Sequence, residues 1–318
     1  MQTKYKILRI DPVHPSLDEI LTRKGFQIDQ DLSRDYNEII KKIHLYDGLI
    51  LRSAVKVDKQ LIDKAFRLKF IARVGSGTEG IDLTHAASRG IRVFSAPEGN
   101  RNAVAEMTVG LLIGLLRNIN KADNEIKSGR WLRSSNRGFE LEGKTLAIIG
   151  YGNTGKALAK KLAGFEMNLI FYDIRTGLED EFARQTDMEE IFQTADILSL
   201  HVPLTEKTRY LVNKDYISRF KKHFFLINTS RGEVVKTEDL VMALEQGKIK
   251  GAALDVIEYE NPAFGDMIWQ GNIPGSLRKL MEMPQVILTP HIAGITYESS
   301  VKLARVTAQK ILSFFENT

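Results

Sequence analysis

The sequence predicts an α/β protein made of two doubly wound, Rossmann-like domains with parallel sheets and a cleft between them. Short apolar segments alternate with helical patterns along almost the whole chain, and these segments are apolar throughout rather than on one face. Strands of this kind belong to parallel sheets that helices cover on both sides. There are too many such strands for one sheet, and the stretch Pro97–Arg101 interrupts their rhythm. We therefore expect two domains.

The expected strands fall into two groups separated by a long helix from around Ala103 to Lys127. The first group comprises Tyr5–Ile10, Gly48–Arg52, Phe70–Val74 and Arg92–Ser95. The second comprises Thr145–Ile149, Leu169–Tyr172, Ile197–His201, Phe224–Asn228, Ala252–Val256 and Val286–Thr289. The last helix, Tyr297 to Phe315, has no following strand, so we expect it to pack back onto the first domain. Residues 1–100 and 290–318 would form an outer, flavodoxin-like domain around an inserted domain of residues 101–289.

The composition excludes several classes of function. The chain has no cysteine, which rules out disulfides and thiolate metal sites and fits a reducing, cytoplasmic compartment. We expect no metal, no signal peptide and no membrane span, because the most apolar run, Val109–Leu116, is far shorter than the ~20 residues a span needs. The net charge of +5 comes from scattered basic pairs such as Lys41-Lys42, which favour a small anionic ligand over nucleic acid.

A glycine-rich turn opens the inserted domain. Gly150, Gly152 and Gly155 have the G-x-G-x-x-G spacing of dinucleotide-binding folds, and they stand between an apolar strand and a helical pattern, as that motif requires. The first glycine permits a tight turn, the second lets backbone amides approach a pyrophosphate, and the third allows close helix–strand contact. The helix N-terminus then adds partial positive charge beside the phosphates.

The next strand ends at Asp173, about 20 residues further on, where a carboxylate accepts hydrogen bonds from the adenosine ribose hydroxyls. It would repel a ribose 2′-phosphate, so the sequence favours NAD over NADP. Arg175 qualifies this prediction, because an arginine nearby can accommodate such a phosphate.

Three later strands end in residues that suit hydride transfer to or from a 2-keto or 2-hydroxy acid. Arg231 follows one strand, the acids Asp255, Glu258 and Glu260 follow another, and His291 follows the last. A guanidinium holds a carboxylate in a two-bonded fork, and a histidine exchanges a proton with the carbonyl oxygen. A carboxylate beside a histidine favours the protonated imidazole and fixes its orientation.

These motifs together resemble the D-isomer-specific 2-hydroxyacid dehydrogenase family over nearly the whole chain. The resemblance rests on GYGNTG, HVPLT, INTSRGEVV, GAALDV followed by Glu260, and TPHIAG. It implies that Arg231 anchors the substrate, that His291 is the acid/base and that Glu260 is its partner, with Glu258 as a rival for that place. Asp255 would lie near the nicotinamide and influence the titration of the site.

The resemblance also implies a set of cofactor contacts. His201 would contact NAD rather than perform chemistry, whereas His14, His44, His85 and His223 have no such setting. The full set is Gly150, Gly152, Asn153, Thr154, Gly155, Asp173, His201, Val202, Pro203, Thr208, Thr229, Ser230, Asp255 and Gly294.

In this family the outer domain decides the substrate, and residues 51–82 resemble those of D-3-phosphoglycerate dehydrogenases. The implied substrate residues are Arg52, Ser53, Arg73, Val74, Gly75 and Ser76, with Arg133 of a GRWLR segment reaching a partner subunit's site in a homodimer. Two arginines beyond Arg231 suit a phosphate. The alternative is that Arg52 and Arg73 are ordinary ion-pair residues.

Two departures weaken this match. The chain has Thr78-Glu79-Gly80 where the family commonly has an acidic or amide residue followed by asparagine. Residues 264–283 are also longer than usual and would place Met267 or Trp269 over the cleft. The chain stops at Thr318, so we expect a short form without a C-terminal serine-sensing domain.

The sequence leaves other functions open on the same machinery. A glyoxylate or hydroxypyruvate reductase and a D-lactate-type dehydrogenase are alternatives within the enzyme class. An NADH-sensing scaffold is an alternative of another class, because the family also includes transcriptional corepressors.

Overall fold

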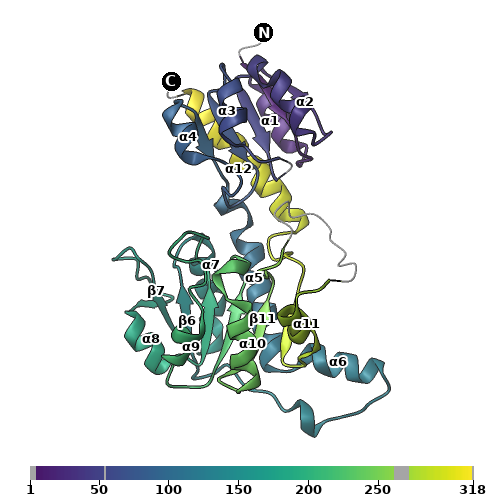
Figure 1. Cartoon of the computed structure of the whole chain (residues 1–318). Helices are drawn as coiled ribbons and strands as arrows, with labels where there is room; N and C mark the ends of the chain where they lie inside the picture. The colour runs from purple at the N-terminus through teal and green to yellow at the C-terminus, as the bar shows by residue number, and fades with distance from the viewer. Residues whose placement is uncertain (1–4, 54, 261–271, 317–318) are drawn as a thin grey trace. The chain divides into compact units, whose positions relative to one another are not determined.

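The computed structural model describes residues 5–53, 55–260 and 272–316, which form two parallel sheets in two units (Figure 1). Of these residues, unit 1 comprises 5–53, 55–101 and 295–316, and unit 2 comprises 102–260 and 272–294. The chain returns to unit 1 after Gly294, whereas the sequence analysis expected the return at residue 290. The loop that follows the last strand is hydrogen-bonded to Asp255 of unit 2 and therefore belongs to that unit.

Unit 1 has a five-stranded parallel sheet in the order β2-β1-β3-β4-β5, the flavodoxin-like order. Its strands are β1 (Tyr5–Arg9), β2 (Phe26–Gln30), β3 (Gly48–Leu51), β4 (Phe70–Arg73) and β5 (Arg92–Phe94). Its helices are α1 (Ser16–Arg23), α2 (Tyr36–Lys42), the 3₁₀ turn η1 (Ile43–Leu45), α3 (Lys59–Lys64), α4 (Leu83–Ser88) and α12 (Tyr297–Glu316).

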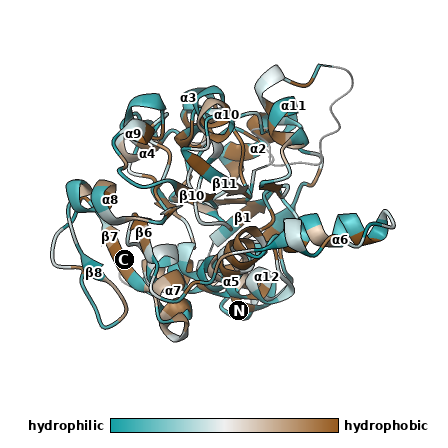
Figure 2. Ribbon diagram, turned by 90° about the horizontal axis from the view of Figure 1, so that it is seen from below, coloured by the Kyte–Doolittle hydropathy of each residue, from teal (hydrophilic) through white to brown (hydrophobic). Residues whose placement is uncertain are grey.

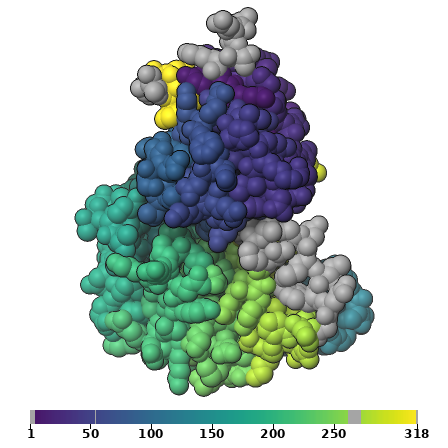
Figure 3. All heavy atoms as spheres, turned by 45° about the horizontal axis from the view of Figure 1, so that its top comes forward, coloured from purple at the N-terminus to yellow at the C-terminus, as the bar shows by residue number. Residues whose placement is uncertain are grey.

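The final helix of the chain completes the core of unit 1. Apolar side chains of α12, among them Leu303 and Ile311, share one buried cluster with Leu17 of α1 and Phe70 of β4. Lys310 Nζ also donates to the Ser95 carbonyl, 2.8 Å away. Figure 3 shows this C-terminal segment in yellow against the purple and blue N-terminal residues, which are far from it in sequence.

Unit 2 has a seven-stranded parallel sheet in the order β12-β11-β10-β9-β6-β7-β8. Its strands are β6 (Thr145–Ile149), β7 (Asn168–Tyr172), β8 (Arg184–Gln185), β9 (Ile197–Leu200), β10 (Phe224–Asn228), β11 (Ile249–Leu254) and β12 (Val286–Leu288). The strand order reverses between β6 and β9, which both pair with their neighbours in parallel. In such folds a ligand binds outside the carboxyl ends of the strands at this switch point.

Helices cover both faces of this sheet. The long helix α5 (Pro97–Leu116) and α7 (Asn153–Leu162) pack on one face. The other face carries α8 (Met188–Thr194), α9 (Lys214–Ser218), α10 (Thr237–Glu245) and α11 (Gly275–Glu282). The remaining elements are α6 (Ile119–Lys127), η2 (Ser134–Asn136), η3 (Ala163–Phe165) and η4 (Gly232–Val234). Figure 2 shows apolar strands such as β10 between helices with hydrophilic outer faces.

The fold class and every strand expected from the sequence are confirmed, but two strands were missed. Both lie at sheet edges, where one side of the strand has no neighbour. β2 reads FQIDQ, in which apolar and polar residues alternate, and β8 has two residues, so neither forms an apolar run.

The prediction of one helix from Ala103 to Lys127 is wrong in two respects. The helix begins earlier, at Pro97, a residue whose fixed φ suits the first helical position. It ends at Leu116, and Asn118 takes the left-handed conformation (φ 55°), which asparagine tolerates well. α6 then starts in a new direction, bent by 65° from α5. Among the described residues, only this bent pair together has the length and apolarity of a membrane span, and no single helix does.

Candidate active site

The glycine-rich turn follows β6 at the switch point of the unit 2 sheet. Gly150 has φ of 93°, and a Cβ there would lie 2.7 Å from the His201 carbonyl oxygen. A Cβ on Gly155 would clash with the Gly150 carbonyl, whereas Gly152 faces open space. The first and third glycines are therefore fixed by close packing, and the second leaves room for a ligand.

The start of α7 suits an anion. Gly152 is its N-cap residue and has no side chain to cap the first turn, so no side-chain hydrogen bond occupies that position. Asn153 and Thr154 follow in this turn and are half-buried. The free amide groups of a helix N-terminus bind phosphate through hydrogen bonds and partial charge. This end of α7 therefore fits the pyrophosphate of a dinucleotide.

Asp173 ends β7, beside the glycine-rich turn. Its carboxylate accepts the Tyr151 backbone N–H at 2.8 Å, and Arg175 Nε and backbone N–H at 3.0 Å each. Burial alone would raise the pKa of Asp173, but these hydrogen bonds outweigh it and hold the pKa below its ordinary value. Asp173 is therefore a charged acceptor, and Arg175 shares its charge.

His201 ends β9 on the other side of the switch point and is 9% exposed. Its Nε2 shares a hydrogen bond with Ser199 Oγ at 2.8 Å, while the buried Nδ1 has no partner among the described residues. Burial lowers the pKa of His201 to about 4, so the ring is neutral near pH 7. Buried polar atoms normally have a partner, so Nδ1 fits a site that a ligand or water completes.

The loop after His201 carries three more of the expected cofactor residues. Val202 and Pro203 lead into a turn that Thr208 holds by donating from Oγ1 to the Pro203 carbonyl at 2.6 Å. Thr205 adds a second bond within this turn, because its N–H donates to Thr208 Oγ1 at 2.8 Å. Thr208 is therefore engaged in the shape of the loop.

The segments that carry Arg231, Glu260 and His291 adjoin at the carboxyl ends of β10, β11 and β12. The Asp255 N–H donates to the Asn228 carbonyl at 3.0 Å, and the His291 N–H donates to the Asp255 carbonyl at 2.7 Å. The backbone after Arg231 also passes so close to Ile257 that any Cβ at Gly232 would clash with it.

Glu260 is the glutamate that pairs with the histidine. His291 Nδ1 lies 2.6 Å from Glu260 Oε2, and both side chains are partly buried. Glu260 Oε1 accepts the Ile257 N–H at 2.7 Å, which fixes the carboxylate. Glu258 instead accepts the Tyr210 hydroxyl at 2.8 Å and the Thr237 N–H at 3.0 Å. Glu258 therefore has a different role in the fold.

Asp255 clamps the loop that carries His291. This carboxylate is 1% exposed and accepts the Thr289 hydroxyl at 2.6 Å and the backbone N–H groups of Ile292 and Ala293 at 2.9 and 2.8 Å. The clamp holds His291 with φ of 55°, a left-handed conformation that histidine rarely adopts. The sequence analysis did not predict this role. It depends on how Thr289 and the backbone of the TPHIAG motif fold around the carboxylate of Asp255.

The turn around Arg231 is held by a residue that the sequence analysis did not single out. Asn228 is fully buried; its Oδ1 accepts from Ser230 Oγ at 2.7 Å, and its Nδ2 donates to the Arg231 carbonyl at 2.9 Å. Arg231 Nη1 donates to the Ser230 carbonyl at 2.7 Å. Thr229 Oγ1 shares a hydrogen bond with Thr108 Oγ1 of α5 at 3.0 Å.

The expected substrate residues of unit 1 gather at the carboxyl ends of β3 and β4. Arg52 and Ser53 donate their backbone N–H groups to Asp11 Oδ2 at 2.6 and 2.9 Å. Arg73 is 7% exposed; its Nε donates to the Arg52 carbonyl at 2.8 Å and its Nη1 to Glu79 Oε2 at 2.7 Å. Val74, Gly75 and Ser76 follow directly. Glu79, one of the departures from the family pattern, thus neutralises part of the charge of Arg73.

Arg133 lies on an exposed arm between α6 and η2 in unit 2. The base of the arm is fixed by Asn136 Nδ2, which donates to Glu125 Oε2 at 2.5 Å, and by Lys121 Nζ, which donates to Asn136 Oδ1 at 2.8 Å. Met267 and Trp269, expected over the cleft, lie outside the described residues.

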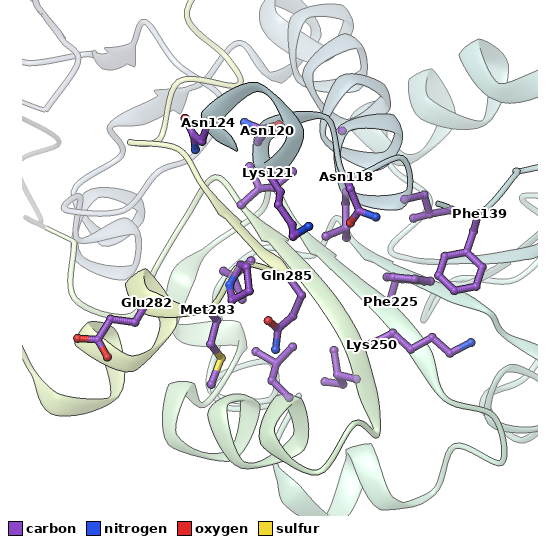
Figure 4. A pocket seen from close by; sticks show the side chains of 18 of the residues that line it. Asn118, Asn120, Lys121, Asn124, Phe139, Phe225, Lys250, Glu282, Met283 and Gln285 are labelled. Atoms are coloured by element: carbon purple, nitrogen blue, oxygen red, sulfur yellow. The ribbon is translucent and has the colours of Figure 1, made fainter. Parts of the chain in front are cut away.

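A pocket of about 760 Å³ lies at the opposite edge of the unit 2 sheet, near the amino ends of β10, β11 and β12 (Figure 4). Lys121 and Asn124 of α6, Phe225 of β10 and Gln285 before β12 are among the side chains that line it. None of the expected catalytic or cofactor residues is among its lining residues. It is therefore separate from the candidate active site, despite its size.

Comparison with known proteins identifies the family. Residues 109–293 match the family described as D-isomer specific 2-hydroxyacid dehydrogenase, NAD binding domain. The chain is 36% identical to the D-3-phosphoglycerate dehydrogenase of Methanocaldococcus jannaschii, over 96% of this chain and 56% of that protein. It is 34% identical to the hydroxypyruvate reductase of Thermotoga maritima, over 97% of both. It resembles the crystal structure of D-lactate dehydrogenase from Aquifex aeolicus, complexed with NAD and lactic acid, with a TM-score of 0.83 and 28% identity over 98% of this chain and 96% of that one.

The chain therefore belongs to the D-isomer-specific 2-hydroxyacid dehydrogenases, a family of oxidoreductases, and its cofactor is NAD. It spans only about half the length of the M. jannaschii relative, but nearly all of the T. maritima one.

The carboxylate of Asp173 generates a prediction about the cofactor. NADH should bind more tightly than NADPH, and Asp173→Ala should weaken NADH binding by roughly 1.5–3 kcal/mol, the contribution of a hydrogen bond to a charged group. The same change should reduce the difference in affinity between NADH and NADPH, because it removes a negative charge and releases Arg175. Fluorescence titration with both cofactors measures this, with Arg175→Ala as the control that keeps the preference for NADH. Equal affinities in the unmutated protein would sink the prediction.

Proposed function

We propose that this protein interconverts a D-2-hydroxy acid and its 2-keto acid with NAD. The observation that carries the proposal is the 2.6 Å contact between His291 and Glu260, beside the strand end that carries Arg231 in an NAD-binding unit. An acid/base pair next to a guanidinium supplies what this reaction needs beyond the cofactor. NAD, when bound, accepts or supplies the hydride.

Each residue of the site has one role in this proposal. Arg231 holds the substrate carboxylate in a charge-assisted fork and polarises the neighbouring carbonyl. His291 faces Glu260 with Nδ1, so Nε2 is the ring atom that gives a proton to the substrate oxygen in reduction and takes it in oxidation. Glu260 stabilises the positive imidazolium and fixes the ring. Asp255 holds the loop in place through its three hydrogen bonds.

The substrate pair that we propose first is 3-phosphoglycerate and 3-phosphohydroxypyruvate, which would place the protein in serine biosynthesis in the cytoplasm. The resemblance of residues 51–82 and the relative in M. jannaschii support this choice. A second candidate is the reduction of glyoxylate or hydroxypyruvate, and a third is a D-lactate-type reaction. The relative in T. maritima and the ion pair between Arg73 and Glu79 favour the second candidate, because a paired guanidinium attracts a phosphate less strongly.

The proposal predicts turnover in a substrate panel. 3-Phosphohydroxypyruvate, hydroxypyruvate, glyoxylate and pyruvate should be compared by kcat/KM with NADH, and at least one of them should be reduced efficiently. His291→Ala should lower kcat by ~10²–10⁴-fold, because it removes the proton donor. Arg231→Ala should raise KM and lower kcat together, since it removes the carboxylate anchor. Both variants should keep the affinity for NADH. Tight NADH binding with negligible turnover of every substrate would instead favour an NADH-sensing scaffold.

The two glutamates predict different pH profiles. Glu260→Gln removes the negative neighbour of the imidazolium, so the pH above which keto-acid reduction declines should move to lower pH. The acid limb of the oxidation profile should move in the same direction, because oxidation needs the neutral ring. Glu258→Gln is the matched control and should leave both limbs in place, since Glu258 bonds Tyr210 and Thr237. A shift in Glu258→Gln alone would mean that the wrong glutamate was chosen.

We also propose that the protein is a homodimer formed through α6 and the arm that follows it. Large apolar side chains are exposed along this region, with Ile119 at 50%, Ile126 at 51% and Trp131 at 78%. Apolar exposure of this kind marks a protein interface. Light scattering should give the mass of a dimer, and Trp131→Glu should give a monomer. Arg133→Ala should keep the dimer but lower activity, as expected if Arg133 enters the neighbouring site. A monomer in the unmutated protein at working concentration would overturn both parts.

A further inference from the structure

Tyr151 occupies a position of the glycine-rich turn at which the motif specifies no residue type. Its side chain is fully buried and is among the largest in the core to be so. The ring stacks on Phe171 of β7, with centroids 3.7 Å apart and planes 9° from parallel. Burial and Asp180 both raise the pKa of Tyr151, so the hydroxyl remains a donor.

The Tyr151 hydroxyl donates to Asp180 Oδ1 at 2.8 Å. Asp180 lies in the segment 173–183, which joins β7 to β8, and the same oxygen accepts the backbone N–H groups of Phe182 and Ala183 at 3.0 and 3.3 Å. Lys156 Nζ is also near, 4.0 Å from Asp180 Oδ2. Asp180 therefore organises the middle of this segment around the tyrosine.

The same segment carries Arg175 at its start. Gln185 of β8 ties the first half of the segment to that strand, because its Nε2 donates to the Arg175 carbonyl at 2.7 Å and its Oε1 accepts the Leu178 N–H at 3.1 Å. Arg175 in turn bonds the carboxylate of Asp173. A change at Asp180 would therefore alter the positions of Arg175 and Asp173, which are expected beside the adenosine ribose.

Tyr151 also acts on Asp173 directly, because its backbone N–H donates to the Asp173 carboxylate. One residue thus joins the turn that binds pyrophosphate, the acid that binds ribose and the segment behind that acid. We propose that Tyr151 is a positioning residue for the adenosine half of NAD, and that its bond to Asp180 is the contact through which it acts. The inference rests on NAD as cofactor and is independent of the substrate.

The test is the binding of NADH and of ADP-ribose, which contains only the adenosine half and the pyrophosphate with its second ribose. Tyr151→Phe keeps the ring stack and removes one hydrogen bond to a charged group, so the Kd of both ligands should rise roughly tenfold. Asp180→Asn should give a similar rise, and the double variant should bind no more weakly than either single one, because the two changes remove the same bond. The KM for NADH should rise together with the Kd, because both depend on how the adenosine half of the cofactor is held.

Tyr36→Phe is the matched control. Tyr36 donates to Asp58 Oδ1 at 2.6 Å in unit 1, so this variant also removes a bond between tyrosine and aspartate, away from the nucleotide turn. It should leave the affinity for both ligands unchanged. If Tyr151→Phe loses thermal stability as this control does but keeps its affinity for NADH and ADP-ribose, Tyr151 is only a core residue and the proposal is overturned. If Tyr151→Phe fails to fold, Asp180→Asn, which leaves the stacked rings intact, decides by the same measurement. Absence of turnover with every keto acid would overturn the proposed function while the binding data still decide this inference.

Discussion

The candidate active site depends on the buried carboxylate of Asp255. A charged group that is 1% exposed is costly to bury unless donors surround it, and here a hydroxyl and two backbone N–H groups from residues 289–293 supply them. Satisfying that charge forces the loop after β12 to wrap around the end of β11. His291 is thereby held in a left-handed conformation and meets Glu260. The contact between His291 and Glu260 is thus a consequence of how one buried charge is satisfied.

In the glycine-rich turn of unit 2, close backbone contacts fix the shape of the chain, as the buried charge of Asp255 does for the loop after β12. Gly150 and Gly155 are fixed by contacts that leave no space for a Cβ, so the turn has one shape. Asp173 is oriented by an N–H from inside that turn, which couples its carboxylate to the shape of the glycine-rich turn. Because His201 packs its carbonyl against Gly150, the loop on the far side of the switch point is placed by the same glycine. The glycine-rich turn therefore fixes the positions of two further segments, the end of β7 and the loop after β9.

The sequence alone was sufficient for the fold class and for the edge of the sheet at which the predicted site residues lie, because parallel strands deliver their carboxyl ends to one edge and each motif follows a strand. It was insufficient where a partner is remote in sequence. Nothing local marks Tyr151 as the partner of Asp180. Asn228 bonds residues only two and three positions away, but an asparagine at the end of an apolar strand does not show by itself which neighbours it bonds. The edge strands β2 and β8 lacked an apolar run, and the break at Asn118 depends on a single left-handed residue that no periodicity reveals.

Glu79, which departs from the family pattern, affects the charge of unit 1 through its ion pair with Arg73. A phosphorylated acid carries more negative charge than a simple keto acid and needs cations beyond the one that holds its carboxylate. In unit 1 the guanidinium of Arg73 is largely withdrawn from solvent and already shares its charge with Glu79, whereas Arg52 is exposed. Glu79 is partly exposed, so solvent screens this ion pair, but the pair still reduces the positive charge that Arg73 offers to an incoming phosphate. The number of arginines in residues 51–82 therefore overstates the positive charge that unit 1 offers to a phosphate.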